Sequence, residues 1–412
     1  MFGTLEPLMI RRARELASQR RHQVVALAQR LVQTPSFSGQ EGEVASLVVR
    51  AMTDAGFDRV SVDPAGNVIG WMDGRETRPL LMFNCHLDHV NLNARRELWR
   101  HPPFSGTLTE GRLVGLGASD TKGALAAQIM SAGVLREMSS SLGGTLCVTA
   151  VVAEEISTFG MEYLLQHTCR PDLVVLGEAT NLGVNVGHRG SFGVTVQISG
   201  LPCHASAPWR GLNAIDVARE LLVLAAELDE QLPRHDWHGK GTLSPQGIAS
   251  DPYDGGVLPD RCSVILKRRL IQGESYQSAL GEIRALLERV RNRLPTATLE
   301  IQPPKGSIRT YTGLEFAPVP GEFARPWLLD SAHPFVRTAV ETIRQVIGGE
   351  PKLGCWDFGT HGVITSAARS IPTIGLAPGR EDVTHTPEDH VRIDELVDAV
   401  AIYAALAAAI FA

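Results

Sequence analysis

Several short stretches of the sequence are almost wholly apolar, and helical stretches separate them. The runs "PLLMF", "GTLCVTAVVA" and "PDLVVLGEA" contain few polar residues, which is typical of strands that are buried on both faces. A helical stretch, "TKGALAAQIMSAGVLREM", lies between the first two runs. We therefore expect an α/β fold, in which a mostly parallel sheet is covered by helices on both faces.

The length of the chain and a change in its sequence pattern indicate two domains. A chain of 412 residues is long enough for about two domains with cores of their own. Near residue 188 the buried runs give way to alternating strands such as "SFGVTVQISGLP" and amphipathic helices such as "LNAIDVARELLVLAAELDEQL". We predict an inserted α+β domain at residues 189–305 and a discontinuous catalytic domain of residues 1–188 and 306–412.

Both terminal stretches are predicted to be helical. Residues 6–32 carry a helical pattern, but they lack the apolar region and cleavage site of a secretory signal. The last stretch, "AVAIYAALAAAIFA", falls short of the roughly 20 residues that a membrane-spanning helix needs. We expect it to be a buried helix.

Charge and cysteine usage argue against several classes of partner. The chain has 39 Lys and Arg against 45 Asp and Glu, a net charge of -6, which does not favour nucleic acid or an anionic membrane. Its six cysteines are scattered without a Cys-x-x-Cys pair, so neither a disulfide framework nor a thiolate zinc site is expected. We predict a protein of the reducing cytoplasm.

Acidic and imidazole side chains follow the predicted buried strands or lie in tight loops. Each alone could be an ordinary turn or strand-end residue. Because the carboxyl ends of parallel strands meet at one edge of a sheet, together they predict one acidic crevice. They are His86, Asp88 and His89 in "NCHLDHV", Asp120 in "GLGASDTKG", Glu154 and Glu155 in "TAVVAEEIS", Glu178 in "LVVLGEAT" and His385 in "EDVTHTPEDH".

Two divalent cations would offset the charge of such a crevice. Imidazole nitrogen and carboxylate oxygen, without thiolate, suit zinc, cobalt or manganese, and one carboxylate can bridge two ions. A cation pair lowers the pKa of a bound water toward about 7 and stabilises the charge that develops in acyl transfer. "GLGASDTKG" fits neither a dinucleotide fingerprint nor a P-loop, and no Gly-x-Ser-x-Gly elbow occurs. The sequence therefore predicts a two-metal hydrolytic site.

The order of these motifs resembles a known family. "HLD", "ASDTKG", "AEE", "GEAT", "CHAS" and the closing "HTPEDHV" are similar to the motifs of the co-catalytic zinc aminoacylases, deacetylases and exopeptidases. That family includes acetylornithine deacetylase, succinyl-diaminopimelate desuccinylase and carboxypeptidase-like enzymes. "WDFGTHGV" followed by "IGLAPGREDVTHTPEDHV" looks like the branch often labelled a selenium-metabolism-linked hydrolase.

The resemblance implies a role for each metal ligand. His86 and Glu178 would bind one ion, Glu155 and His385 would bind the other, and Asp120 would bridge the two. Both ions are expected to be zinc, with cobalt or manganese as alternatives.

The resemblance also implies which residues act beside the metals. Asp88 would accept the spare ring N–H of His86 and fix its tautomer. Glu154 would be the general base that takes the proton of the water and later gives it to the leaving amine. His204 in "LPCHASAP" would donate to the oxyanion in a partner subunit's site, which implies a homodimer through the inserted domain. His89 has no matching role and is expected to be structural.

The resemblance says less about the substrate. Arg269 matches the arginine that holds a substrate carboxylate, a group that a guanidinium can bind bidentately. Lys267 stands where relatives usually have Asp. Gly359, Thr360 and His361 are predicted to line the substrate pocket, with His361 where relatives often have Asn.

Three functions remain open on this sequence. We expect an amidohydrolase that cleaves a small N-acyl amino acid with a free carboxylate. A di- or tripeptidase, or a carboxypeptidase-type exopeptidase, would use the same machinery with a different pocket. A non-catalytic binding protein could keep the fold without the chemistry.

Overall fold

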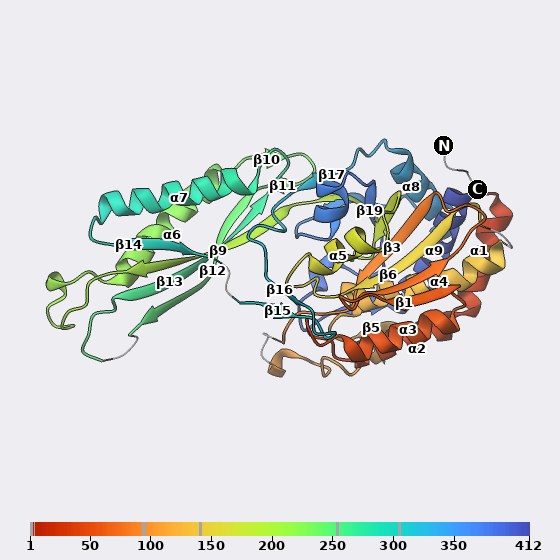
Figure 1. Ribbon diagram of the computed structural model, residues 1–412, viewed down its shortest axis with the longest axis horizontal. Coiled ribbons are helices and arrows are strands. Elements are labelled where there is room, and N and C mark those ends of the chain that lie inside the picture. Colours follow the sequence, from red (N-terminus) through yellow and green to blue (C-terminus); the bar gives the residue numbers. More distant parts are fainter. Residues whose placement is uncertain (1–2, 4, 93–95, 140–141, 253–254, 304–305) are drawn as a thin grey trace.

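The computed structural model describes residues 3, 5–92, 96–139, 142–252, 255–303 and 306–412. Figure 1 shows an elongated molecule with a larger unit, which contains both chain ends, and a smaller unit beside it. A nine-stranded sheet lies in the larger unit, and a separate four-stranded sheet lies in the smaller one. The expected fold class is confirmed.

The centre of the large sheet is parallel. Its strands follow the order β1-β2-β6-β3-β7-β19-β8-β17, and β18 pairs with β8. Neighbours within the group β6, β3, β7 and β19 are parallel, whereas β1, β2, β8 and β17 are joined through antiparallel pairs. The bounds are β1 Arg59–Val62, β2 Val68–Met72, β3 Leu80–His86, β6 Thr145–Val151, β7 Leu173–Leu176, β8 Val184–His188, β17 Trp327–Leu328, β18 Leu353–Trp356 and β19 Thr373–Gly375.

Helices cover both faces of this sheet, as its apolar strands predict. Within β3, Leu81 and Phe83 belong to the core on the α4 and α9 side, whereas Leu80 and Met82 belong to the core on the α5 side. Since successive strand residues point to opposite faces, this strand can be apolar throughout only if both faces are covered. The helices are α1 Pro7–Gln19, α2 Arg21–Gln33, α3 Gly42–Asp54, α4 Gly123–Met138, α5 Phe159–His167, α8 Pro334–Ile347 and α9 Ile393–Phe411.

The two terminal stretches differ in how well the sequence predicts them. The helical pattern at 6–32 forms two helices, α1 and α2, because the backbone leaves the helical region at Arg20 (φ -94°, ψ 7°). The apolar C-terminal stretch forms α9, which is buried as expected and packs against α1, α4 and α8. Over the ranges that the structure describes, no helix combines the length and the apolar character needed to cross a membrane.

The smaller unit is an antiparallel sheet of order β12-β13-β9-β14, with α6 and α7 packed on one face. The sequence does not predict β12, because Pro245 and Gly247 interrupt its pattern. Both are tolerated because β12 is an edge strand and its register shifts between them. The predicted boundary at residue 305 lies outside the described residues. The bounds are β9 Gly190–Ser199, α6 Ala214–Gln231, β12 Thr242–Asp251, β13 Arg261–Leu270, α7 Tyr276–Arg293 and β14 Thr298–Gln302.

Short strands complete the structure. β20 (His390–Arg392), β5 (Arg112–Val114) and β4 (Thr107–Thr109) form a small sheet, and both β20 and β3 pack against the turn Ala118–Lys122. Two further pairs are β10 (Arg234–His235) with β11 (Gly239–Lys240), and β15 (Ile308–Arg309) with β16 (Glu315–Phe316).

A buried ion pair joins β13 to α7 in the smaller unit. The guanidinium of Arg268 is fully buried and pairs with Glu274 and, at 3.3 Å, with Glu282. We expect Arg268→Ala to lower the free energy of unfolding by about 3 kcal/mol, because it leaves the largely buried Glu274 carboxylate unpaired. Urea denaturation measures this. Arg289→Ala breaks only the exposed pair with Glu227 and should lower the free energy of unfolding by less than about 1 kcal/mol. Equal losses of unfolding free energy in the two variants would contradict the prediction.

Candidate metal centre

Three neighbouring parallel strands bring predicted ligands to one edge of the large sheet. His86 is the last residue of β3, Glu154 and Glu155 follow β6, and Glu178 follows β7. Because β6, β3 and β7 are adjacent and parallel, their carboxyl ends lie side by side. This is the place where α/β folds bind ligands.

Two loops add the remaining predicted ligands. Asp120 lies in the turn Ala118–Lys122 that leads into α4, and His385 follows the short helix Glu381–Val383. One Asp120 oxygen is 2.8 Å from His86 Nε2, and the other is 3.0 Å from His385 Nε2. Glu178 Oε1 is 3.7 Å from His86 Nε2, and Glu155 Oε2 is 3.3 Å from His385 Nε2. Asp120 therefore lies between the two histidines.

These side chains fit divalent cations. His86 forms one potential ligand group with Glu154 and Glu178, and another with Asp120 and Glu155; in each group the ligand atoms lie within 4.8 Å of one another. Oxygen Oε1 of Glu154 and Oε1 of Glu155 are buried without a hydrogen-bond partner among the described residues. A buried carboxylate oxygen needs a partner, and nitrogen and oxygen donors without sulfur suit zinc, cobalt or manganese.

The protonation of the cluster reflects its crowded negative charge. Burial, followed by Asp120, raises the pKa of Glu178 to about 8. Burial, followed by Glu178, raises the pKa of Glu154 well above its usual value. Burial alone would lower the pKa of His385, but hydrogen bonds to Asp120 and Glu155 raise it to about 11. A bound cation would replace these protons.

Cation uptake should therefore release protons. At pH 7 the His385 imidazole, with a pKa of about 11, and the Glu178 carboxyl, with a pKa of about 8, both hold protons in the metal-free protein. A metal ligand must lose its proton, so the affinity for zinc should rise as the pH rises from 6 to 8. Calorimetric titration with zinc in buffers of different ionisation enthalpy measures the protons released. An affinity that does not change with pH would contradict this prediction.

Asp88 holds the loop that carries Glu154 and Glu155. Its buried carboxylate accepts hydrogen bonds from the backbone N–H of each glutamate, at 3.1 Å, and from the Ser38 hydroxyl at 2.6 Å. The predicted contact with His86 is longer, because Nδ1 of His86 lies 3.5 Å from the carboxylate and 2.9 Å from the Asp88 carbonyl. A carbonyl can only accept, so Nδ1 carries hydrogen and Nε2 faces the ligand cluster.

Other carboxylates fix the loops of the site, and the sequence does not point to them. Glu41 is buried, and its Oε1 accepts the backbone N–H of Ala153 at 3.1 Å; Ala153 has a left-handed backbone (φ 59°) directly before Glu154. Asp389 accepts the backbone N–H groups of Gly117 and Ser119, at 2.6 and 3.0 Å, in the loop that carries Asp120. Left-handed backbone in a non-glycine residue is strained and persists only where its surroundings hold it.

His89 makes the contacts of a structural residue. Its Nε2 accepts the backbone N–H of Ser36 at 2.9 Å, and its Nδ1 lies 3.0 Å from the Val90 carbonyl. Burial, followed by the charge of Lys122, lowers the pKa of His89 to about 4. The ring is therefore neutral at physiological pH, and both of its nitrogens are used.

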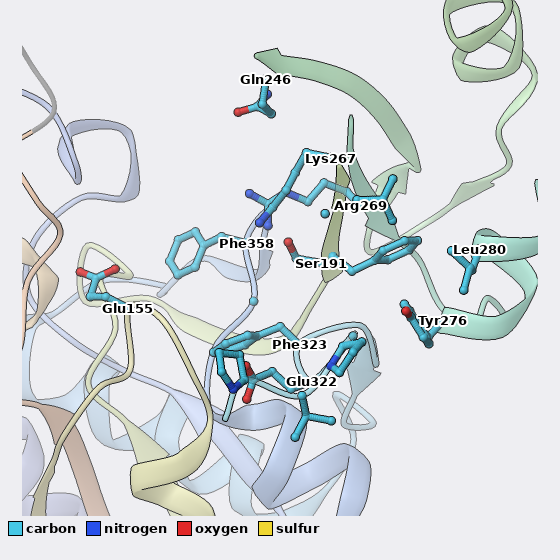
Figure 2. Close-up of a pocket in the computed structure, with 18 of the residues that line it drawn as sticks. Glu155, Ser191, Gln246, Lys267, Arg269, Tyr276, Leu280, Glu322, Phe323 and Phe358 are labelled. Carbon is cyan, nitrogen blue, oxygen red and sulfur yellow. The ribbon is translucent and has the colours of Figure 1, made fainter. Parts of the chain in front are cut away.

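A cleft of about 940 Å³ runs from the ligand cluster to the smaller unit (Figure 2). The large unit lines it with Asp120, Glu154, Glu155, Glu178 and His385, and the smaller unit lines it with Arg269, Lys267 and Ser191; Gly359, Phe323 and Phe358 are among the remaining residues.

Three other predicted site residues do not line this cleft. The Thr360 backbone N–H donates to His188 Nδ1 at 2.8 Å inside the protein. His361 is buried, with Nε2 unpartnered among the described residues, and burial lowers its pKa to about 3. His204 is exposed in the smaller unit, where its Nδ1 accepts the Ser206 backbone N–H at 3.2 Å. The structure thus places Arg269 and Gly359 on the cleft, and Thr360, His361 and His204 elsewhere.

Hydrolysis with a metal-activated water needs ligands for the cations, a general base beside them and a cleft for the substrate. The carboxyl edge of the large sheet offers potential metal ligands beside such a cleft, and with the family match the chain is a metal-dependent hydrolase. It belongs to the peptidase family M20/M25/M40, whose family model matches residues 82–409. The predicted family of aminoacylases, deacetylases and exopeptidases is thereby confirmed.

Two relatives are similar to this chain in sequence, and one solved structure shares its fold. The uncharacterized protein YgeY of Escherichia coli strain K12 is 32% identical over 379 residues, which are 91% of each chain. The acetylornithine deacetylase of Photorhabdus laumondii is 26% identical over 388 residues, 89% of this chain and 92% of its own. The YXEP protein of Bacillus subtilis, a dinuclear metal binding peptidase, superposes with a TM-score of 0.67 at 17% identity, over 97% of this chain and 99% of its own.

Proposed function

We propose that the protein hydrolyses the amide bond of a small N-acyl amino acid, as a deacetylase or deacylase. The observation that carries this proposal is the position of Glu154. Its buried carboxylate belongs to a potential ligand group, lines the cleft, and has Oε1 unpartnered among the described residues. The similarity to a protein named acetylornithine deacetylase supports an N-acyl amino acid as the substrate.

We assign His86 and Glu178 to one cation, Glu155 and His385 to a second, and Asp120 to both. The position of Asp120, with one oxygen near each histidine, supports the bridging role. Zinc is our choice, and cobalt or manganese are the alternatives. When bound, such ions acidify a water and neutralise the negative charge that develops on the carbonyl oxygen.

Glu154 holds and moves the proton in this proposal. Its carboxylate lines the cleft beside the ligand cluster, so the group can both take a proton from water and deliver it to the leaving nitrogen. Asp88 acts through the backbone, because it fixes the N–H groups of Glu154 and Glu155. In this proposal the backbone contacts of Asp88 position both glutamates, so that Glu155 would bind a cation and Glu154 would act as the base.

We propose a homodimer through the inserted domain, residues 189–305, with residues 1–188 and 306–412 as the catalytic domain. Separate hydrophobic cores support the division. Near His204, Leu201 and Trp209 expose 53% and 77% of their surfaces, and an interface would cover such apolar area. His204 lies outside the cleft lining of its own chain, and in this proposal it donates to the oxyanion in the partner's cleft.

Mixed subunits test the shared site. His204→Ala homodimers and Glu154→Gln homodimers should each have little activity. Mixed in equal amounts and allowed to exchange, they should regain up to about a quarter of wild-type activity, because about half of the dimers are then mixed and each mixed dimer contains one site with both residues intact. No recovery at any ratio, with subunit exchange verified, would count against the trans role.

Two alternatives remain. An exopeptidase acting on di- or tripeptides, or from the carboxyl end, would use the same residues, and the structural similarity to a metal-binding peptidase supports it. A binding protein on the same fold would need no general base. We also propose a cytoplasmic location, supported by six free cysteines.

One assay separates these functions. Purified protein is analysed for bound metals and then incubated with N-acetyl amino acids, dipeptides and tripeptides. We expect two divalent ions per chain and hydrolysis of the N-acetyl derivatives. Cleavage of peptides alone would favour the exopeptidase, and two bound metals without hydrolysis of any amide would favour the binding protein.

A further inference from the structure

Two cationic side chains of the smaller unit lie next to each other in the lining of the cleft. Lys267 and Arg269 alternate with the buried Arg268 on β13, so both project from the face that α6 and α7 leave uncovered. Figure 2 shows the two side chains side by side, reaching toward the cleft on the side of Phe358. β13 lies beside β9, where Arg269 is opposite Ser191 and Lys267 is opposite Gly193.

Within the described part of the chain, neither cation has an ion-pair partner. Two neighbouring arginines have ion-pair partners: Arg189 lies 2.8 Å from an Asp357 oxygen, and Arg268 pairs with Glu274. Lys267 and Arg269 are only partly exposed. Burial, followed by the charge of Arg269, lowers the pKa of Lys267. Partly buried charges without a partner are unfavourable, and two like charges side by side are more so. A ligand with negative charge would relieve both penalties.

The spacing of the two cations indicates how that negative charge is distributed. Residues two apart on a strand lie about 6.6 Å apart along it. Aspartate and glutamate carry two carboxylates three or four covalent bonds apart, a shorter span that the long, flexible side chains of Lys267 and Arg269 can match by bringing their charged ends together. A guanidinium can hold one carboxylate bidentately while an ammonium holds the other as a point charge. A substrate with one carboxylate would leave one of the two cations unpaired.

We propose that the substrate is an amino acid with an acidic side chain, linked through its α-nitrogen to the acyl group that is removed, and that Lys267 and Arg269 each bind one of its carboxylates. The inference rests on the proposed function, because it takes the cleft that joins these cations to Glu154 and Glu155 as the substrate site. It makes Lys267 a specificity-determining residue.

The test compares two substrates that differ only in charge. N-acetylglutamate and N-acetylglutamine have nearly the same shape. The metal-loaded wild-type protein should hydrolyse the glutamate derivative with a kcat/KM at least tenfold higher. Lys267→Met should lower that ratio at least tenfold, chiefly through the KM for the glutamate derivative. A misfolded variant would lose both activities together, whereas this ratio reports charge recognition.

A cation on the same strand is the matched control. Arg261 also lies on β13, but it pairs with Asp251 at 2.5 Å and does not line the cleft. Arg261→Met removes the same charge from the protein and should leave the glutamate-to-glutamine ratio unchanged. An equal loss of the ratio in this variant would show that only the overall field matters, and it would overturn the assignment of Lys267.

Binding of a product separates this inference from the proposed function. Free glutamate and glutamine are titrated into wild-type and Lys267→Met protein by calorimetry. Tighter binding of glutamate, weakened at least tenfold by Lys267→Met, supports the two-cation site even if no amide is hydrolysed. Equal binding of glutamate and glutamine, or binding of glutamate that Lys267→Met does not weaken, overturns the inference even if the protein proves to be an active deacylase.

Discussion

Glu154→Gln protein should bind its metals and lose almost all of its activity. Loss of a general acid–base group lowers kcat by about 10²- to 10⁴-fold. The amide of glutamine keeps the size of the side chain but cannot take a proton from water. Because Glu154 Oε1 has no hydrogen-bond partner among the described residues, the substitution breaks no bond there. Steady-state kinetics with the best substrate of the N-acetyl panel measures the effect.

The adjacent residue provides the control. Glu155→Gln changes the same chemical group one position along the chain, where Oε2 lies 3.3 Å from His385 Nε2. We expect this variant to retain less metal, whereas Glu154→Gln retains the wild-type content by elemental analysis. If Glu154→Gln has wild-type kcat, the proton-transfer role belongs to another group. If it loses metal instead, Glu154 is a ligand.

Asp120→Ala should abolish both metal sites together. One Asp120 oxygen lies 2.8 Å from His86 Nε2 and the other 3.0 Å from His385 Nε2, so in the proposed assignment its removal takes a ligand from each cation. Metal ions contribute several kcal/mol to transition-state stabilisation, and activity should fall below about one thousandth of wild type. A ligand that binds only the folded state raises the melting temperature, so zinc should raise the Tm of the wild type but not of Asp120→Ala.

An exposed aspartate near His385 is the matched control for this variant. Asp382 lies in the same loop and pairs with Arg380 on the surface. Asp382→Ala should keep the zinc-dependent rise in Tm and nearly full activity. A rise in Tm with zinc in Asp120→Ala that equals the wild-type rise would remove Asp120 from the ligand set.

The sequence predicts that the expected ligand side chains meet at one edge of the sheet, as they do in the structure, because the signal is local. His86, Glu154, Glu155 and Glu178 each stand within three residues of the end of an apolar run, and a parallel sheet brings such positions together whatever the connections between them. The apolar character of these strands also explains why helices cover both faces of the sheet. These conclusions need only the alternation of strands with helices and the identity of the residues at strand ends.

The residues that support the site carry no such signal. Glu41 reaches the Ala153 backbone across 112 positions, and Asp389 reaches Gly117 across 272. Long-range hydrogen bonds of this kind leave no periodic pattern in the chain. The break between α1 and α2 at Arg20 also leaves no signal in the sequence, because the apolar spacing continues across it. For Lys267, alternation predicts which face it occupies, but only the packed structure shows that no carboxylate of the described chain pairs with it.

The position of α9 affects the order in which the protein can fold. This helix packs against α1, α4 and α8 over one face of the large sheet, and all of them precede it in the chain. The smaller sheet, whose strands lie between residues 190 and 302, is complete much earlier during synthesis. On the ribosome, the smaller unit can therefore fold while the larger sheet still exposes apolar surface. Nascent chains in that state are aggregation-prone and are expected to depend on chaperones.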